Sequence, residues 1–200
     1  MEGVMYRMLT NIKRILFGTF VFIFVRPLAY LLYDKKYLKG KYFQHIYSVG
    51  WLWTMRGIFF QKILGYNREL RWPASNRITA GLSKNIEFHP DDLNNFQGMG
   101  LYIQALGKVK IGKGTYIGPN VGIISSNHKL DNLDEHEDPK PINIGEKCWL
   151  GMNSVILPGV TLGNGTIVGA GAVVTKSFPQ GDCVIAGNPA KVIKQITGEK

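Results

Sequence analysis

The sequence of 200 residues is poor in cysteine and in acidic side chains. Its cysteines are Cys148 and Cys183, too few for the disulfide framework of a small secreted domain, so we expect a reduced, cytoplasmic setting. The first apolar run lacks a small-residue cleavage site behind it, which argues against a secretory signal. No glycine-rich motif of the P-loop or dinucleotide-binding type is present, which excludes those phosphate-binding folds. Glycine itself is abundant, with 24 residues, which indicates many tight turns.

Acidic side chains are outnumbered by basic ones only in the N-terminal part of the chain. Residues 1–80 contain 13 Lys or Arg and 3 acidic side chains, whereas residues 81–200 contain 11 of each. The same front segment also holds 17 of the 23 aromatic side chains. Basic segments can bind nucleic acid, but these charges alternate with long apolar runs, so we expect a membrane surface and no nucleic acid. The sequence therefore predicts a helical membrane-associated segment over residues 1–75 and a second domain over residues 76–196.

A six-residue repeat occupies the second half of the chain. Its nine lead positions are all aliphatic, an outcome expected by chance roughly once in 10^5. The leads are Ile111, Ile117, Ile123, Ile144, Leu150, Ile156, Leu162, Val168 and Val174. A glycine often follows the lead, and the fifth position is mostly small or β-branched.

Hexads of this kind predict a triangular coil, in which each hexad supplies one short strand and one corner. The aliphatic lead points into the prism, and stacked coils bury a continuous core. Glycine after the lead relieves crowding at the corner and tolerates unusual backbone angles. An ordinary sheet protein with glycine turns is the alternative, but period-two alternation does not produce a sustained period of six. The predicted fold class is therefore mainly β, a parallel β-helix.

The repeat is interrupted once, between Ile123 and Ile144. The spacing of these two leads is not a multiple of six, and residues 127–141 are polar and acidic and contain no hexads. We expect this segment to leave the prism as an extruded loop and to return at Pro141. Loops held by a rigid scaffold commonly carry function.

The front segment contains an apolar stretch of nearly membrane-spanning length. Residues 15–33 are interrupted by Arg26 and Pro27, and both flanks are basic. A single span would leave one basic flank on the wrong side of the membrane, so we favour a helix that is kinked at Pro27, enters one leaflet and returns. A tilted span and a soluble helix that contacts a trimer partner are the other possibilities.

Residues 44–65 predict a second helix. Small or polar side chains recur along it at helical spacing and suit close helix packing, whereas the aromatic side chains around them suit a membrane interface. The small or polar stripe consists of Gly50, Thr54, Gly57 and Gln61.

Three strings resemble the hexapeptide-repeat acyltransferases, in particular the galactoside, maltose and capsule or colanic-acid sugar O-acetyltransferases. The string at residues 118–128 reads GPNVGIISSNH, and the string at residues 141–163 reads PINIGEKCWLGMNSVILPGVTLG. The third string has two parts, VGAGAVVTK at residues 168–176 and AGNPAKVIK at residues 186–194. The resemblance covers roughly residues 98–196, and residues 1–75 lie outside it.

The resemblance implies a left-handed parallel β-helix that forms a homotrimer, with active sites between neighbouring subunits and acetyl-CoA or another acyl-CoA as donor. It implies that His128, at the root of the extruded loop, is the general base that removes a proton from a sugar hydroxyl. The galactoside and maltose enzymes carry a serine where this chain has Met152, so only the Met152 backbone N–H is left to stabilise the oxyanion. Trp149 either lines this site or packs in the core.

The resemblance also implies contacts to both substrates. We expect the backbone amides of Gly151, Gly169, Ala170 and Gly187 to be free for the pantetheine arm. Thr175 and Lys176 fall where the family contacts the cofactor, and Lys191 and Lys194 fall where it often has basic groups near the nucleotide phosphates. Asn127 and His136 are candidates for the acceptor site. No metal is expected, and spacing does not select which loop carboxylate, if any, orients His128.

The predicted function is acyl transfer from coenzyme A to a sugar hydroxyl in membrane-linked polysaccharide or glycolipid biosynthesis. We expect it at the cytoplasmic face of the cell membrane, with attachment through residues 1–65. A serine-type O-acetyltransferase is an alternative, although its large soluble helical domain is missing. A zinc enzyme of the carbonic-anhydrase kind needs three shared histidines, and none of the four histidines occupies a repeated hexad position. A non-catalytic scaffold is disfavoured by His128 and the cofactor strings. The acceptor and the acyl length are not determined by the sequence.

Overall fold

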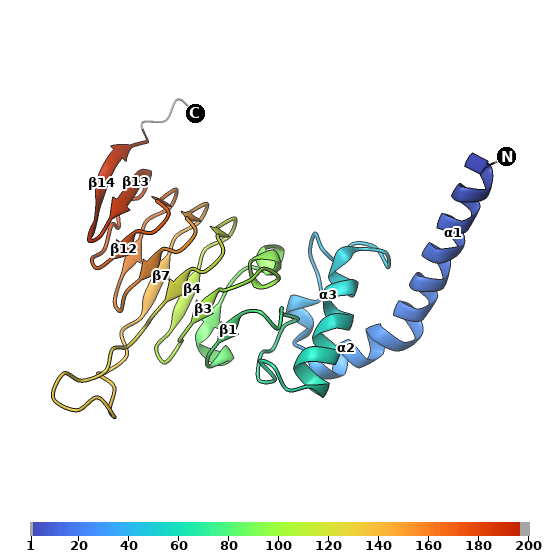
Figure 1. Cartoon of the computed structure of the whole chain (residues 1–200), viewed down its shortest axis with the longest axis horizontal. Helices are drawn as coiled ribbons and strands as arrows, with labels where there is room; N and C mark the ends of the chain where they lie inside the picture. The colour runs from blue at the N-terminus through green and yellow to red at the C-terminus, as the bar shows by residue number, and fades with distance from the viewer. Residues whose placement is uncertain (1, 197–200) are drawn as a thin grey trace. The chain divides into compact units, whose positions relative to one another are not determined.

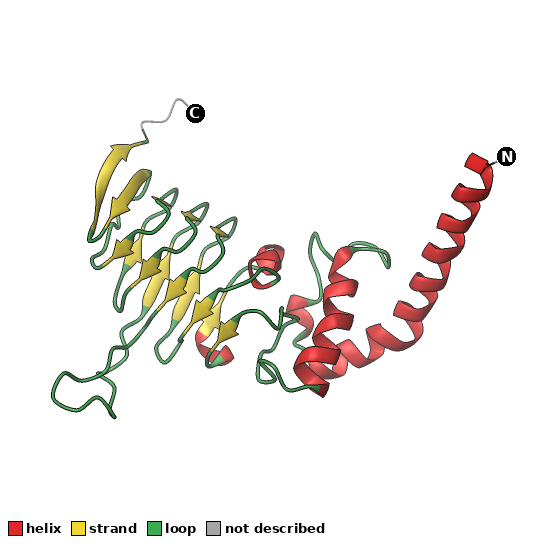
Figure 2. Cartoon of the chain, in the orientation of Figure 1, coloured by secondary structure: helices red, strands yellow, loops and turns green. Residues whose placement is uncertain are grey.

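A computed structural model describes residues 2–196, with side chains from residue 10 onward. The chain divides into two compact units, Met1–Ala74 and Ser75–Lys200. The first unit is helical and the second consists of short strands joined by turns (Figures 1 and 2).

The helical unit begins with one long helix in three consecutive segments. These are α1 (Glu2–Phe20), a π-helical turn η1 (Val21–Val25) and α2 (Arg26–Leu32). The helix is continuous through Pro27, because helical backbone angles run through Val25 and Arg26 into the proline. It changes direction between α1 and α2, where the sequence predicted a kink (Figure 1). Proline lacks an N–H and its ring crowds the carbonyl four residues earlier. The π turn lies at that carbonyl and widens the helix there, which accommodates the ring.

The second predicted helix is present and packs against the first. A 3-10 turn, η2 (Lys35–Tyr37), precedes it in the chain. The second helix itself comprises α3 (Val49–Gly57) and a π-helical segment, η3 (Ile58–Ile63). The small or polar stripe is buried along its whole length, as the sequence predicted. A Cβ atom at Gly50 would lie 2.4 Å from the Tyr42 carbonyl oxygen, and the Tyr33 hydroxyl donates to Gln61 Oε1 at 3.0 Å. The stripe therefore permits close packing and satisfies its own polar groups.

Three sheets form the sides of a prism in the second unit (Figure 2). Sheet A contains β1 (Thr79–Ala80), β3 (Tyr102–Ile103), β6 (Gly122–Ile123), β9 (Val155–Ile156) and β12 (Val173–Val174). Sheet B contains β2 (Ile86–Glu87), β4 (Val109–Ile111), β7 (Ile142–Ile144) and β10 (Thr161–Leu162). Sheet C contains β5 (Tyr116–Ile117), β8 (Trp149–Leu150), β11 (Ile167–Val168), β13 (Cys183–Gly187) and β14 (Ala190–Gln195).

The chain visits the sheets in the order A, B, C, so successive coils stack in parallel. Only the last pair, β13 with β14, is antiparallel. In the first coil, the 3-10 turn η4 (Ser83–Asn85) precedes β2, and the 3-10 segment η5 (Pro90–Phe96) takes the place of a strand of sheet C. The repeat thus forms the predicted parallel β-helix.

The hexad leads form the core of the prism. Eight of the nine are buried, and Ile117 is half-buried because η5 rather than a strand precedes it on its side of the prism. The fifth positions from Cys148 to Phe178 are also buried. Their polar members are satisfied by the corners, since Ser154 Oγ donates to the Gly151 carbonyl and Thr166 Oγ1 to the Gly163 carbonyl, each at 2.7 Å.

The extruded loop is an in-register insertion. Val155 pairs with Val173 and Gly122 pairs with Val155, so the second pair is farther apart in sequence than the first. The difference between these two sequence separations equals the length of residues 127–141. Without those residues, the coil that contains the loop would have the same length as the next coil. Figure 1 shows this segment leaving the stack of coils between β6 and β7.

Core leads are expected to differ in their contribution to stability according to burial. Ile156→Ala should lower the free energy of unfolding of the β-helix by about 2–5 kcal/mol, because it leaves a cavity among packed leads. Ile117→Ala should cost less, since its side chain is only half-buried. Denaturant unfolding followed by circular dichroism measures both, and equal losses would contradict this account of the core.

Removal of residues 127–141 is expected to leave the β-helix folded. The deletion joins Ser126 to Ile142 and restores a coil of ordinary length with every lead in register. The melting temperature should change by no more than about 5 °C, because a closed surface loop contributes little beyond its closure entropy. A matched deletion that is one residue shorter, 128–141, shifts the register and should unfold the unit. Similar melting of both variants would show that the loop is not such an insertion.

Candidate functional site

The extruded loop is closed at its stem by a short antiparallel pairing. The Glu137 N–H donates to the Asn127 carbonyl at 2.8 Å, and the Lys129 N–H donates to the Glu135 carbonyl at 2.9 Å. His128 and His136 face each other between these two bonds. The two predicted site histidines are therefore brought together, although the tip of the loop separates them in the sequence.

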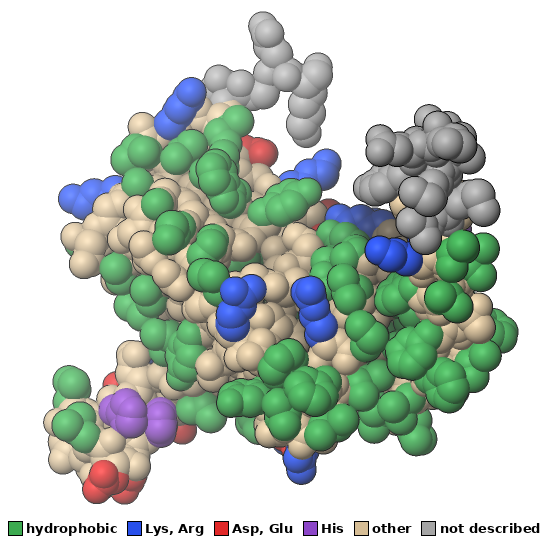
Figure 3. Space-filling view, turned by 45° about the vertical axis from the view of Figure 1, so that its right-hand side comes forward, with side chains coloured by type: hydrophobic (Ala, Val, Ile, Leu, Met, Phe, Trp, Pro, Cys, Tyr) green, Lys and Arg blue, Asp and Glu red, His purple; other side chains and the backbone are tan. Residues whose placement is uncertain are grey.

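His128 is exposed, and its ring has a defined partner on one side only. Its Nδ1 atom lies 2.6 Å from the Leu133 carbonyl oxygen. A carbonyl oxygen only accepts, so Nδ1 carries the hydrogen and Nε2 of the neutral ring is left as the proton acceptor. The His128 and His136 ring centroids are 4.2 Å apart at an interplanar angle of 35°. Histidine side chains lie at the solvent-facing surface of the loop (Figure 3).

Nothing in the sequence indicated this partner of His128. The loop carboxylates that could have oriented His128 are paired elsewhere or face solvent. Glu135, for example, pairs with Lys129 and accepts from Asn132 Nδ2 at 3.0 Å. Among the described residues, no carboxylate contacts His128. The orienting group is a backbone carbonyl, which every residue has, so only the folded loop identifies it.

A row of backbone positions lines the corner between sheets C and A. The residues two positions after the aligned leads of sheet C stack in register; they are Pro119, Met152, Ala170 and Gly187. Within the described part of the chain, the N–H groups of Met152 and Ala170 have no hydrogen-bond partner. Both residues are exposed, so we take these two N–H groups as the candidate donors of the corner.

The expectation of free amides at Gly151 and Gly169 is wrong. The Gly151 N–H donates to the Val168 carbonyl at 2.8 Å, and the Gly169 N–H donates to the Ile185 carbonyl at 2.7 Å. These amides belong to the ladder between coils. Glycine is required at 151 for space, because a Cβ atom there would lie 2.6 Å from the Ala170 nitrogen. Gly187 belongs to β13 and pairs with Ala190 of β14.

Trp149 lies on the outer face of sheet C. It aligns between Tyr116 and Ile167, and 55% of its surface is exposed, so the alternative of a packed core tryptophan is wrong. Met152 is 48% exposed beside it. Large apolar side chains are thus open on the face that leads to the Met152 amide.

The remaining predicted residues occupy two other places. Thr175 and Lys176 follow β12 at the corner between sheets A and B, the corner from which the loop with His128 also leaves. Lys191 and Lys194 are exposed on β14, at the edge of sheet C. Sheet A therefore separates His128, Thr175 and Lys176 from the corner that carries Met152 and Ala170.

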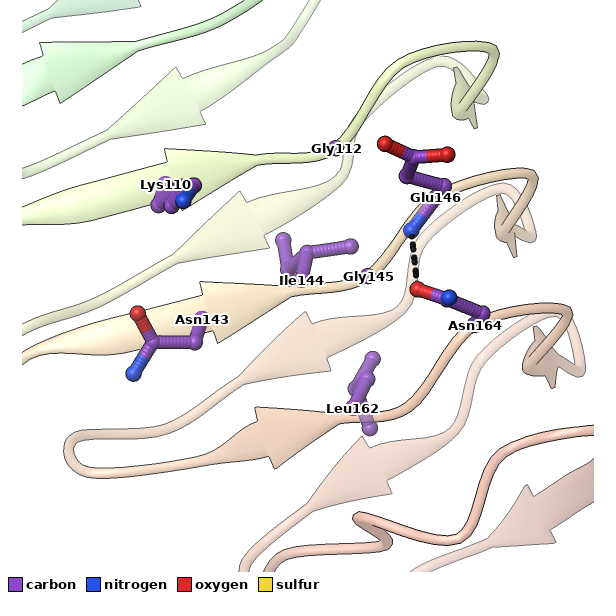
Figure 4. A pocket seen from close by; sticks show the side chains of 8 residues that line it. All are labelled: Lys110, Gly112, Asn143, Ile144, Gly145, Glu146, Leu162 and Asn164. Atoms are coloured by element: carbon purple, nitrogen blue, oxygen red, sulfur yellow. Dashed lines mark hydrogen bonds between the residues drawn. The ribbon is translucent and has the colours of Figure 1, made fainter.

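One hollow of about 340 Å³ lies at the third corner, between sheets B and C (Figure 4). Its floor includes the leads Ile144 and Leu162, and the Glu146 N–H donates to Asn164 Oδ1 at 2.8 Å on its rim. It is lined by Lys110, Gly112, Asn143, Ile144, Gly145, Glu146, Leu162 and Asn164. None of the predicted site residues lines it.

The cysteines are structural. Cys148 and Cys183 are both buried, and burial raises the pKa of each thiol, which keeps it protonated at neutral pH. Within the described residues there is also no group of three or more His, Cys, Asp or Glu side chains that could hold a metal ion.

Comparison with known proteins matches the repeat to a family. Residues 141–176 match the bacterial transferase hexapeptide (six repeats) model. A Schizosaccharomyces pombe protein named as an acetyltransferase is 43% identical over 94 residues, which cover 46% of this chain and 45% of that protein. The Escherichia coli K12 protein WbbJ, named as a lipopolysaccharide biosynthesis O-acetyl transferase, is 37% identical over 114 residues, with 50% and 56% covered. The chain thus spans about half the length of these relatives.

A solved structure gives the same result for the fold. Galactoside acetyltransferase in complex with coenzyme A superposes with a TM-score of 0.51 and 28% identity, over 63% of this chain and 62% of that chain. Similarity to hexapeptide-repeat acetyltransferases implies the left-handed winding that the sequence predicted. The β-helical part of this chain is therefore similar to hexapeptide-repeat proteins of the bacterial transferase type, among them galactoside, maltose and colanic-acid acetyltransferases.

Proposed function

We propose that this chain transfers an acyl group, acetyl by default, from coenzyme A to a hydroxyl of a sugar. The observation that carries the proposal is the state of His128, whose Nδ1 is bonded to a carbonyl and whose Nε2 is free to accept a proton. This base stands on the loop that interrupts a hexapeptide repeat, and the named relatives of that repeat are acetyltransferases.

The proposed reaction uses two groups of the protein. His128 Nε2 takes the proton of the acceptor hydroxyl while its oxygen attacks the thioester carbonyl. The carbonyl oxygen becomes an oxyanion and accepts from the Met152 N–H, which has no partner in the described structure and is held by a rigid corner. The tetrahedral intermediate then collapses, the C–S bond breaks, and the coenzyme A thiolate takes the proton from the His128 imidazolium. The products are the acylated sugar and free coenzyme A.

The division of these groups between two corners supports a site shared by two copies of the chain. His128 and Met152 flank sheet A from opposite sides, so a neighbouring copy is the natural source of the second group. We propose a homotrimer with one such site at each of its interfaces. Exposed Trp149 on the outer face of sheet C supports an apolar lining there.

The proposed donor site runs along the same corner. The partnerless Ala170 N–H lies one coil from Met152 and suits a carbonyl of the pantetheine arm. Gly151 and Gly169 allow the coils to stack closely beneath it, because the next coil fills the space that a Cβ atom would take. Gly187, together with Thr175 and Lys176 of the neighbouring copy, is proposed as a further contact. Lys191 and Lys194 carry exposed charges that suit the nucleotide phosphates.

The proposed acceptor is a membrane-linked sugar, as in polysaccharide or glycolipid biosynthesis at the cytoplasmic face of the membrane. WbbJ, one of the relatives, is named for lipopolysaccharide biosynthesis. Asn127 and His136 flank the base on the loop and are proposed to bind the acceptor. The basic helical unit, residues 1–74, is proposed to bring the enzyme to the membrane.

His128 substitutions test the base. His128→Ala should lower kcat for acceptor-dependent thiol release from acetyl-CoA by about 10²–10⁴-fold, because no other group takes the hydroxyl proton. His136→Ala should chiefly raise KM for the acceptor, and His45→Ala, an exposed histidine of the helical unit, should change neither. The assay uses detergent-purified protein with sugars, lipid-linked sugars and free serine as acceptors. An unchanged rate for His128→Ala means that the base is misassigned, and acceptance of serine alone supports a serine acetyltransferase.

Met152 substitutions test the oxyanion donor. Met152→Pro removes the N–H, and the corner accepts proline because Pro119 occupies the aligned position one coil away. It should lower kcat by about 10²–10³-fold with little change in KM for acetyl-CoA. Met152→Ala keeps the N–H and should stay within about threefold of the parent rate. Equal losses in the two variants would assign the effect to the side chain instead.

A further inference from the structure

The long helix presents an apolar face that nothing in its own unit covers. Thr10–Leu32 has the length and apolar composition to cross a membrane, with only 22% of its most apolar window buried. Val21, Val25 and Ala29 face α3 and are buried. The rest of the helix surface exposes many large apolar side chains; they are Ile12, Ile15, Leu16, Phe20, Phe22, Ile23, Phe24, Leu28 and Leu31. Hydrophobic side chains are correspondingly displayed over this unit in Figure 3.

Charged groups oppose a span through the bilayer. Arg26 lies inside the apolar stretch, and its Nε donates to the Tyr30 hydroxyl at 3.3 Å. Because α3 and η3 pack on η1 and α2, insertion of that part would also carry Arg56 and Lys62 into the hydrocarbon. Each such charge costs about 2.5–3.5 kcal/mol at the bilayer centre. A helix lying at the surface keeps all three at the level of the head groups.

Cations and aromatic rings are paired on the helical unit, with the rings of Tyr33, Tyr37 and Trp51 buried beneath their cations. Arg26 lies over the rings of both Tyr30 and Trp51, at 5.6 and 6.0 Å from their centroids, and Arg14 lies 5.2 Å over Tyr47. Further pairs are Lys36 with Tyr37, Lys41 with Tyr42, and Lys62 with Tyr33. Trp and Tyr prefer the membrane–water interface, and Lys and Arg extend there toward phosphate. Residues 10–74 contain 11 basic and 2 acidic side chains, which complements an anionic surface.

We infer that the helical unit is a one-leaflet anchor for an anionic phospholipid surface. Its exposed apolar side chains enter the acyl region, its Lys and Arg side chains lie among the phosphates, and the chain returns through α3 to the side on which it entered. Residue 10 and the start of the β-helix at residue 75 are thus on the same side of the membrane. This inference deepens the proposed membrane location but does not depend on acyl transfer.

Flotation tests the surface. The purified full chain is mixed with preformed vesicles of phosphatidylcholine, with or without phosphatidylglycerol, and we expect it to float with the anionic vesicles and to bind the neutral ones more weakly. The double variant Phe24→Glu, Leu28→Glu should lower partitioning about tenfold or more, because both side chains leave the acyl region. Leu82→Glu, at a comparably exposed leucine of the β-helical unit, should have no effect. Failure of the parent chain to float, or equal flotation of the double variant, would overturn the inference.

Cysteine labelling tests the topology. Asn11→Cys and Lys108→Cys place single exposed thiols in the two units, and the native cysteines are buried, so the parent chain gives the background. On vesicle-bound protein, a membrane-impermeant maleimide should label both variants fully without detergent. Protection of Asn11→Cys until detergent is added, with Lys108→Cys labelled throughout, would demonstrate a span and overturn the inference. Neither measurement requires catalysis, so its failure is distinguishable from failure of the proposed activity.

Discussion

The hydrogen-bond ladder between successive coils is the constraint on which the β-helical unit depends. Its strands are mostly two residues long, too short to be stable alone, and each becomes stable by pairing with the strand one coil away. In the coils between Asn143 and Val174, pairing at an interval of three hexads keeps the aliphatic leads inside the prism. The corners need the same register, because the Gly151 N–H reaches the Val168 carbonyl only when the coils align. An insertion is tolerated only where it returns the chain in register, as residues 127–141 do.

This constraint explains how much of the fold the sequence could predict. Each coil repeats the same requirement, so leads and fifth positions are visible as a period without any structure. Ile117 departs from full burial because η5 replaces one strand in the first coil, and a single replacement has no period to reveal it. The outward direction of Trp149 was predictable, since it precedes the buried lead Leu150 and neighbours in a strand face opposite sides. The helical unit was predicted from composition and from its packing stripe, whereas the π turn that accommodates the ring of Pro27 was not predicted.

The sequence could name candidate residues for the site, but it could not give their hydrogen-bond partners. His128 could be selected because it stands at the break in the repeat. Its partner could not, because the Leu133 carbonyl approaches only when the loop closes on itself. For the backbone amides, the sequence led to a wrong prediction. The glycines at 151 and 169 suggested N–H groups without a partner, but both are hydrogen-bonded. In the folded chain the residue after the lead donates to the ladder, and at Met152 and Ala170 the next residue is left without a partner.

The contrast between the paired glycine amides and the partnerless amides of Met152 and Ala170 bears on the chemistry proposed for this chain. A donor that stabilises an oxyanion is most effective when it is already oriented before charge develops, and a partnerless N–H on a stacked corner meets this condition without any side chain. Replacement of the serine of related enzymes by Met152 therefore removes a hydroxyl but leaves the backbone donor unaffected. The proposed base has the opposite setting, because it stands on a loop that the ladder does not hold and is oriented by that loop's own carbonyl. The ladder thus fixes the proposed oxyanion donor, whereas the loop that carries the proposed base can change without disturbing the register of the prism.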